Sequence, residues 1–249
     1  MAHRPLKRLV QGIAAGLGLL LLWQLFSLGV NRPFVPEPLL VFRYLFSHKG
    51  SVLLSHVSAS LLRILSALIL AGLGGGAAGL AMGYFPLAGK YLSPLVYFIY
   101  PIPKIAFLPL FMLFFGLGEG SRIGMLVFIL LFQVIVASRD AASAIAPETF
   151  QILRSLGASH GTVLRLAVIP GVLPSLLSAL RVGLATALSV LFFTETYGTR
   201  QGLGYFIMDA WMRVAYVEMF GGILTLSVAG FILFFGVDAL EKRLCRWRS

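Results

Sequence analysis

The chain alternates between long apolar runs and short polar segments, and this alternation predicts its elements. A bilayer core about 30 Å thick is crossed by roughly 20 residues of α-helix. Strands of roughly 9–11 alternating residues, as in a membrane barrel, would leave longer unbroken runs unexplained. We therefore predict an all-α integral membrane protein with six transmembrane helices. They cover about residues 10–30, 56–83, 92–116, 121–142, 168–193 and 219–240, and the second and third are dense enough in Gly and Pro to be bent.

The first two predicted spans are separated by residues 31–55, which open with the prolines of NRPFVPEP. Leu39, Leu40 and Phe42 beside Arg43 suit a short helix at the membrane surface, and such support is favoured over a docking role. This segment divides the chain. Residues 1–55 would form an N-terminal transmembrane helix with an outer interfacial segment, and residues 56–249 would form a five-helix core.

The second predicted span contains glycines spaced four residues apart, including Gly75, Gly79 and Gly83. A helix face of this kind lets another helix approach closely in lipid. The spacing predicts a close interface within the subunit or across a dimer. A generally glycine-rich membrane helix is the alternative.

A polar stretch, QILRSLGASHGTVLRLAVIP at residues 151–170, interrupts the apolar pattern. Pro147 and Glu148 are typical of a first helical turn. Phe150, Leu153 and Leu156 then recur at helical spacing on one face, and Gly157 is a typical helix stop. We predict a short amphipathic helix over 147–157, followed by a turn and a second helix. A solvated hairpin would explain the pattern, but the length of the segment indicates a partner surface.

The basic residues predict the orientation, because cytoplasmic loops of membrane proteins are enriched in Lys and Arg. With the N-terminus inside, the inner segments and Arg139 hold eleven Lys and Arg residues, against six in the outer segments. Both termini are therefore expected in the cytoplasm. The inner segments are 1–9, 84–91, 143–167 and 241–249, so the polar stretch is cytoplasmic as well.

Composition narrows the class further. The chain is 59% hydrophobic and only 12% charged, which is too apolar for a soluble domain of 249 residues. The net charge of +11 is scattered between apolar runs and not gathered on one face, so nucleic-acid binding is not indicated. The single cysteine, Cys245, excludes an internal disulfide. No cleavable signal peptide is expected, since the apolar run after the basic residues 1–10 lacks a small-residue cleavage site and is long enough to span.

Around Gly157 the sequence resembles a known family. The run LGAS, followed by VIPGVLPSLLSALRVGL, looks like the cytoplasmic loop signature of membrane subunits of bacterial ABC importers. That signature reads E-A-A, three residues, Gly, nine residues and Ile-x-Leu-Pro. Anchored on Gly157, it places Gln151, Ile152 and Leu153 at the E-A-A positions and Pro170 at its close. Gln-Ile-Leu is a departure from that triplet.

Further blocks resemble one branch of the family, the permeases for nitrate, sulfonate, taurine and related small compounds. In chain order they are SASLLRIL, YPIPKIAFLPLFMLFFGLGEGSR, FFTETYGTRQGLGYFI and DALEKRLCRW. Together they extend the resemblance over about residues 55 to 247, with consistent order and spacing.

The resemblance implies a type I ABC importer permease fold and a specific set of partners. A second copy would complete the translocation path, and an outer solute-binding protein would deliver a small solute. Two cytoplasmic ATPase subunits would grip the coupling helix at 147–157, within a loop at about 143–167. The coupling residues implied are Glu148, Gln151, Ile152, Leu153, Gly157, Ala158, Ser159 and Pro170.

The same resemblance places the protein in the bacterial inner membrane and leaves the chemistry to its partners. The chain would bind no cofactor and catalyse no reaction, since ATP and Mg²⁺ would be held by the ATPase subunits. The sequence agrees, because it contains no G-x-x-x-x-G-K-[ST] phosphate loop.

Charged residues within spans are costly, so each one is a candidate functional residue. Lys104 lies in the proline-rich PIPKIAFLP, Arg181 lies near the middle of the fifth predicted span, and Glu195 lies at its outer end. Lys104 and Arg181 are expected either to line the substrate pathway or to form structural ion pairs, for example with Asp140 or Glu195. Glu195 is the third candidate for the pathway.

Catalytic and metal sites are poorly supported. The four histidines show no ligand spacing, and the few acidic residues are dispersed. Two other classes remain as alternatives, a secondary transporter and a polytopic membrane enzyme, both without an ATPase partner. The first would more often show inverted repeats, and none is visible.

Overall fold

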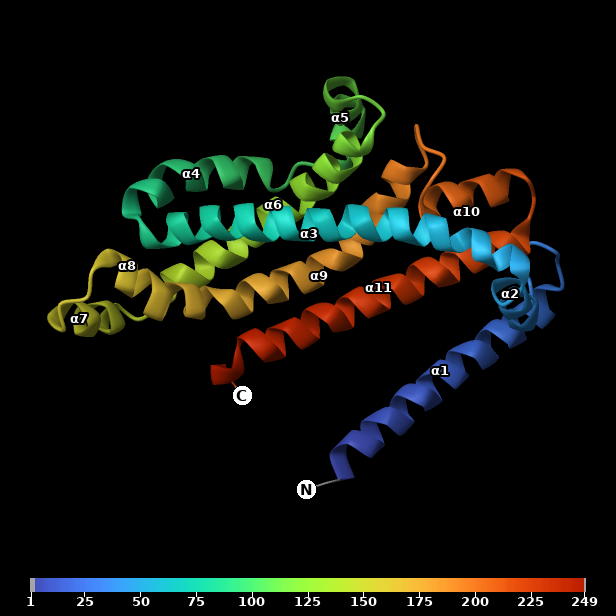
Figure 1. Cartoon of the computed structure of the whole chain (residues 1–249), viewed down its shortest axis with the longest axis horizontal. Coiled ribbons are helices and arrows are strands. Elements are labelled where there is room, and N and C mark those ends of the chain that lie inside the picture. Colours follow the sequence, from blue (N-terminus) through green and yellow to red (C-terminus); the bar gives the residue numbers. More distant parts are fainter. Residues whose placement is uncertain (1–2, 249) are drawn as a thin grey trace.

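A computed structural model describes residues 3–248, and helices dominate them (Figure 1). The long helices are α1 (His3–Val30), α3 (Leu53–Tyr84), α6 (Glu119–Ser143), α9 (Ile169–Glu195) and α11 (Tyr216–Leu244). The shorter ones are α2 (Pro38–Leu45), α4 (Pro86–Ile99), α5 (Leu108–Phe115), α7 (Pro147–Ser155), α8 (His160–Val163) and α10 (Leu203–Met212). The remaining turns are 3₁₀ at His48–Val52, Lys104–Phe107 and Arg246–Arg248, and π at Leu164–Val168. The all-α prediction is confirmed.

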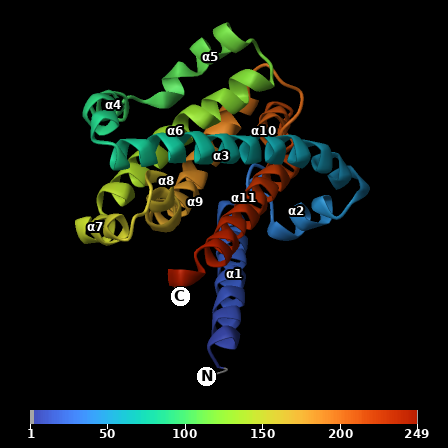
Figure 2. The same cartoon turned by 60° about the vertical axis from the view of Figure 1, so that its left-hand side comes forward.

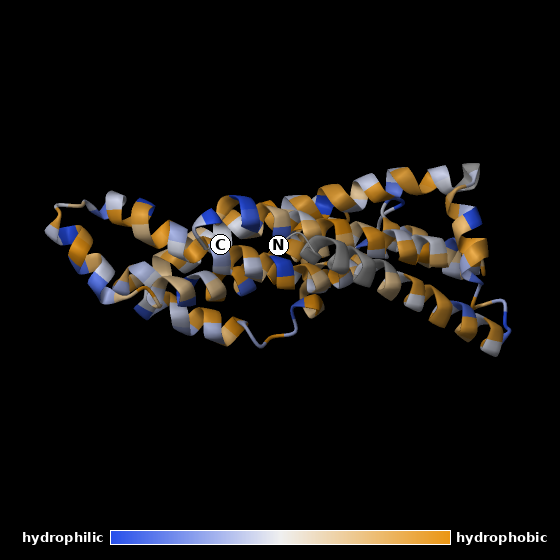
Figure 3. Cartoon of the chain, turned by 90° about the horizontal axis from the view of Figure 1, so that it is seen from below, coloured by the Kyte–Doolittle hydropathy of each residue, from blue (hydrophilic) through white to orange (hydrophobic). Residues whose placement is uncertain are grey.

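The centre of the fold is formed by α3, α6 and α9, which run beside one another along the long axis (Figure 1). Their facing sides bury aliphatic side chains such as Ile64, Leu126 and Leu184. Figure 3 shows apolar residues along most of each helix, and many of the large apolar side chains are exposed. An apolar exterior around a packed apolar centre is the pattern of a helix bundle in lipid.

The glycine face of α3 packs within the subunit. A Cβ at Gly75 would lie 2.9 Å from the carbonyl oxygen of Leu131 in α6, and one at Gly79 would lie 2.7 Å from Cβ of Ser138. Such distances show that the two backbones are in close contact. Gly72 and Gly76 turn towards Leu180 and Leu176 of α9 instead. Of the two interfaces that the spacing allowed, the structure contains the one inside the subunit.

The helices differ in whether they are long and apolar enough to cross a membrane. Among residues 3–248, four helical stretches are long and apolar enough to cross a membrane: Gly50–Tyr84, Glu119–Ser143, His160–Glu195 and Tyr216–Leu244. Pro86–Ile99 and Lys104–Phe115 qualify together as a fifth, and the apolar part of α1, Ala14–Val30, is shorter. Six spans therefore stay a prediction.

The span at 92–116, expected to bend, is divided into two helices. Between α4 and α5 the chain turns by 87° at residues 100–103, before the 3₁₀ turn Lys104–Phe107. Pro101 and Pro103 explain the break, because proline lacks the backbone N–H that continues a helix. Irregular backbone at membrane depth is tolerated where protein or a cavity surrounds it.

The N-terminal helix stands apart from the bundle for most of its length (Figure 2). Its attachment is near its end, where the Trp23 indole donates to the carbonyl of Pro36 and stacks on Phe220 of α11. The hydroxyl of Ser27 also donates to the carbonyl of Val35. The interfacial segment thus joins α1 to α11, and α2 within it matches the short helix predicted there.

Candidate functional site

The predicted coupling region begins with α7, which runs from Pro147 to Ser155. Pro147 at the first turn and Glu148 beside it suit a helix N-terminus, where the missing proline N–H costs nothing and a negative charge faces the helix dipole. The helix ends in two backbone hydrogen bonds, from Gly157 N–H to the Arg154 carbonyl (2.9 Å) and from Ala158 N–H to the Leu153 carbonyl (3.0 Å). This is the Schellman pattern, and it requires the left-handed φ of +77° at Gly157.

The two faces of α7 have different environments. Phe150 and Leu153 pack into a cluster with the buried Val163, Val168 and Val172. Leu156, predicted on the same face as these two residues, is instead 78% exposed and lies outside the cluster, because it follows the last turn of α7. Ile152 is 60% exposed, next to the exposed Glu148 and Gln151. One face therefore anchors α7 to the bundle, and the other presents apolar and polar groups outwards.

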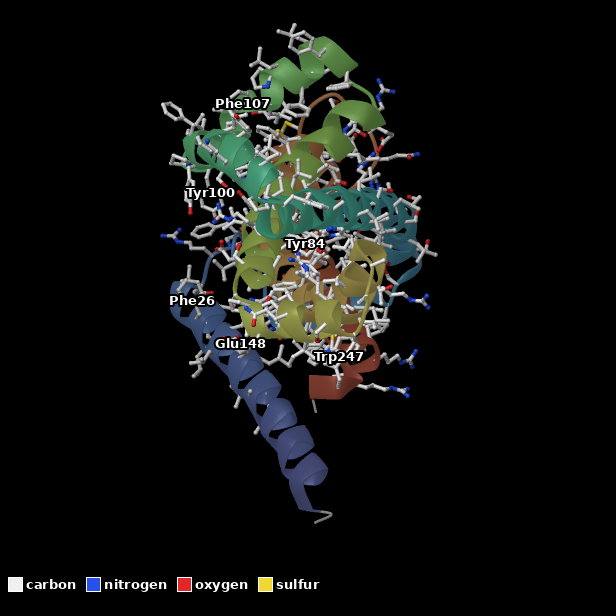
Figure 4. All side chains as sticks on the ribbon, turned by 90° about the vertical axis from the view of Figure 1, so that its left-hand side faces the viewer. Phe26, Tyr84, Tyr100, Phe107, Glu148 and Trp247 are labelled. Carbon is white, nitrogen blue, oxygen red and sulfur yellow. The ribbon has the colours of Figure 1, made fainter. Side chains whose placement is uncertain are left out.

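The turn after α7 is also ordered. Ser159 caps α8, since its hydroxyl accepts from the backbone N–H of Thr162 (3.3 Å). The hydroxyl oxygen of Tyr84, at the end of α3, lies 3.0 Å from Nδ1 of His160, and the ring of Tyr84 contacts that of Phe150. Figure 4 shows Tyr84 on the side of α3 that faces these helices, and Glu148 on α7. Ala158 is half-buried, and Pro170 is half-buried in the first turn of α9.

A groove of about 580 Å³ lies farther along the bundle, beside the break between α4 and α5. Lys104 lines it, and its ammonium donates to the carbonyl of Tyr100 at 2.8 Å. Figure 4 shows Tyr100 and Phe107 on either side of this break. The other lining residues come from the break itself, α6 and α9: Ile102, Ile105, Ile129, Gln133, Ala185, Thr186, Ser189, Val190 and Phe193.

Arg181 does not line this groove. Its guanidinium pairs with Asp238 of α11, with Glu241 3.5 Å away, so it ties α9 to α11. The prediction that Arg181 pairs with Asp140 or Glu195 is therefore wrong. Asp140 instead pairs with its neighbour Arg139 at 2.6 Å.

Glu195 is fully buried in a polar cluster at the other end of α9. Its carboxylate accepts from Arg63 of α3 at 2.7 Å, from the hydroxyl of Ser60 and from the backbone N–H of Gly204. Arg63 also forms two hydrogen bonds of 2.6 Å with Glu119 at the start of α6. This cluster joins α3, α6, α9 and α10.

Sequence reasoning missed Arg63 and Asp238 as ion-pair residues. An arginine within an apolar run is the signal that could have identified Arg63. Arg122, which was counted as an outer-segment residue, is buried and donates to the carbonyls of Leu117 and Gly198. In the part of the chain that the structure describes, no three His, Cys, Asp or Glu residues are grouped as metal ligands.

Comparison with known proteins decides the family. Residues 52–246 match the family described as binding-protein-dependent transport system inner membrane component. The chain belongs to this family. It is the permease subunit of an ABC importer, and neither alternative, a secondary transporter or a polytopic membrane enzyme, has comparable support.

The permease has relatives along nearly its whole length. It is 34% identical to the taurine transport system permease protein TauC of Escherichia coli (strain K12), over 98% of this chain and 92% of that protein. It is 28% identical to the putative aliphatic sulfonates transport permease protein SsuC of Bacillus subtilis (strain 168), over 96% and 88%. These relatives agree with the branch that the sequence blocks indicated.

A solved structure agrees with the fold. An inward-facing form of the MetNI methionine ABC transporter superposes with a TM-score of 0.67 at 19% identity, covering 80% of this chain and 99% of that one. The fold is that of a type I ABC importer permease, as expected.

Proposed function

We propose that this permease moves a small solute, delivered by an external binding protein, through a path that it forms with a second copy of itself. Two ATPase subunits in the cytoplasm would hold ATP and Mg²⁺ and bind α7. The observation that carries this proposal is the two-sided environment of α7. Its inner face is fixed in an apolar cluster, and its outer face exposes Ile152, with Leu156 exposed directly after its last turn.

The packing supports a mechanical role for α7. Its anchoring cluster includes Ala142 of α6 and Val172 of α9, so a displacement of α7 acts on both helices. Close-packed interiors transmit displacement because they have little free volume. A push on the outer face would therefore reach the two helices that line the groove around Lys104.

The groove supports pairing with a second copy. It opens at the surface of one subunit and contains Lys104, Thr186 and Ser189, groups that are unfavourable against lipid. In a dimer with a two-fold axis, the groove of one copy would face the equivalent groove of the other, and the two would enclose a polar path. Because the relatives' names include taurine and aliphatic sulfonates, we propose a small organic compound of this kind as the solute.

Co-assembly tests the partners. The permease should be produced with two different affinity tags on two copies, together with its ATPase and binding protein in the bacterial inner membrane. Capture by one tag should recover the other tag and the ATPase, and the binding protein should stimulate ATP hydrolysis. Recovery of the tagged permease without any ATPase would refute the proposal.

Gly157→Leu tests the coupling role. A leucine resists the left-handed backbone at this position by about 1–2 kcal/mol, although the space beside Gly157 is open. The end of α7 should be reoriented, so that solute uptake and stimulated ATP hydrolysis are lost while the permease still inserts. Gly161→Ala is the matched control, because Gly161 lies in helix α8 of the same loop and its Cβ would meet only Ser159 Oγ, at 3.9 Å. Normal uptake by Gly157→Leu would exclude this role.

A further inference from the structure

The basic residues packed within the bundle differ in whether they have a counter-ion; Lys104 and Arg181 are partly buried, and the others are buried. Arg63, Arg139 and Arg181 each pair with a carboxylate of the same subunit, and Arg122 lies 3.3 Å from Glu119. Lys104 is the exception. Within residues 3–248 no acidic side chain forms a salt bridge with it.

The groups around Lys104 hold its ammonium in place without neutralising it. Nζ donates to the carbonyl of Tyr100 and lies 5.1 Å from the ring centre of Tyr100 and 5.4 Å from that of Phe132. A ring face attracts a cation but carries no net charge. An ammonium has three donors, and the carbonyl uses one of them. A positive charge with free donors is therefore presented to the groove.

A second polar group in the groove also lacks a partner. The Oε1 atom of Gln133 on α6 is buried and forms no hydrogen bond with any described residue. The amide reaches this position because residue 183 of α9 is glycine, where a Cβ would lie 2.6 Å from Oε1. This oxygen accepts hydrogen bonds and would pair only with a donor group of a solute, whereas the N–H groups of the same amide can donate to an anion.

Two hydroxyls complete the polar part of the groove. Thr186 and Ser189 lie one turn apart on α9, and both are exposed at the groove. Ile129, Val190 and Phe193 supply apolar wall beside them. The groove thus combines one cation, an amide and two hydroxyls with an apolar wall, and small organic anions need such a combination.

We propose that Lys104, Gln133, Thr186 and Ser189 form a solute site in the permease, and that a small organic anion provides the counter-ion that Lys104 lacks. The proposal rests on the translocation path proposed above and adds a property to it. The permease itself selects for negative charge, after the binding protein has released the solute. A neutral solute of the same shape leaves the lysine unpaired, and this unpaired charge is unfavourable.

Two isosteric probes test this site directly. Ethanesulfonate carries a negative charge, and ethanesulfonamide has nearly the same shape without it. The permease–ATPase complex, reconstituted in nanodiscs without binding protein, should carry Ala185→Cys in a Cys245→Ser background, because Ala185 is exposed at the groove and supplies none of its polar groups. Ethanesulfonate should slow labelling of the new cysteine by a thiol reagent at concentrations about tenfold lower than ethanesulfonamide requires.

Three substitutions then assign the effect to the lysine. Lys104→Met should abolish the preference for ethanesulfonate, and Lys104→Arg should retain it because the charge is kept. Lys90→Met, an exposed lysine of α4 outside the groove, is the control and should behave as the parent. If Lys104→Met does not assemble, Lys104→Gln replaces it, with the same expected loss.

The outcomes separate this inference from the proposed function. Equal protection by the two probes in the parent complex would overturn the site, as would an unchanged preference in the Lys104→Met complex. In both cases ATPase co-assembly and stimulated hydrolysis would leave the proposed function standing. Loss of ATPase binding by the parent permease would refute the proposed function instead.

Discussion

Two helices of the permease end in the same hydrogen-bond pattern with different residues at the critical position. After α7 the left-handed residue is Gly157, with φ of +77°. After α10 it is Val214, with φ of +60°, where Val214 N–H donates to the Trp211 carbonyl and Ala215 N–H to the Ala210 carbonyl. Glycine adopts this backbone freely, but a β-branched residue is strained in it.

Val214→Gly should stabilise the permease. The left-handed backbone costs valine about 1–2 kcal/mol. The added conformational entropy of glycine in the unfolded chain costs less, about 0.4–1 kcal/mol. The apparent melting temperature in detergent should rise by about 2–4 °C per kcal/mol gained, as expected for a chain of this size. Val214 is 64% exposed, so little packing is lost.

Val228→Gly is the control for this experiment. Val228 is a half-exposed valine in the interior of α11, where glycine lowers stability by about 0.5–1 kcal/mol relative to alanine. The two substitutions should therefore shift the melting temperature in opposite directions. A lower melting temperature for Val214→Gly would show that the valine is not strained.

Residue patterns predicted some of these positions and not others. Gly157 was predictable, because a glycine after a short amphipathic helix is a local signal. The pairing of Arg63 with Glu195 was not, because the two residues are 132 positions apart and only the packing of α3 against α9 brings them together. Charge within a span marks a residue as important, but its partner is a tertiary property.

At the level of elements, the contact between α3 and α6 depends on the absence of side chains. At Gly79 a Cβ would fall against the Ile135 carbonyl oxygen and the Ser138 side chain of α6. At Gly74, on the same helix, a Cβ would lie 3.6 Å from a Leu131 methyl group, which is an ordinary van der Waals distance. The same added methyl group should therefore have different effects at the two positions.

Gly79→Ala should lower the melting temperature, because a backbone carbonyl cannot move aside as a flexible side chain can. Overpacking in a close-packed interior typically costs about 1–3 kcal/mol. Gly74→Ala should leave the melting temperature unchanged or raise it slightly, since alanine favours the helix. Equal losses in both variants would mean that this face of α3 is not an interhelical contact.

The helices themselves were largely predictable from the sequence, whereas the position of the break in the third predicted span was not. The long apolar runs predicted the bounds of α3, α6, α9 and α11 to within a few residues. Pro101 and Pro103 indicated bending, but hydropathy is continuous through 92–116 and does not distinguish a bent span from two short helices. The angle of 87° depends on how α4 and α5 pack against the bundle.

At the level of the whole molecule, α7 and the loop after α9 lie towards opposite ends of the bundle (Figure 1). The first described turns of α1 and the last turn of α11 lie on one side of the molecule, away from α2 (Figure 2). This arrangement suits two chain ends on the same side of a membrane. The distribution of Lys and Arg then predicts that this side is the cytoplasm.

Single cysteines test that orientation. In a Cys245→Ser background, Ser47→Cys and Thr199→Cys should react with a membrane-impermeant thiol reagent in intact cells. Ser159→Cys, in the turn after α7, should react only after the membrane is permeabilised. Ser47 and Ser159 are exposed and Thr199 is half-exposed, so access from the correct side is available. Labelling of Ser159→Cys in intact cells would reverse the orientation and exclude α7 as the ATPase contact.

The π segment Leu164–Val168 determines what the insertion or deletion of one residue would do to the orientation of α7. It lies within one continuous helical stretch, His160–Glu195, between α8 and α9. A π turn accommodates one residue more than an α turn, and each residue of an α-helix accounts for about 100° of rotation. Deleting one residue here would swing α7 around the axis of α9, aiming its outer face away from the ATPase. The number of residues in this segment therefore fixes the orientation of α7 about the axis of α9. In a homologous chain that differs here by one residue, the partner that binds α7 would have to be rotated correspondingly.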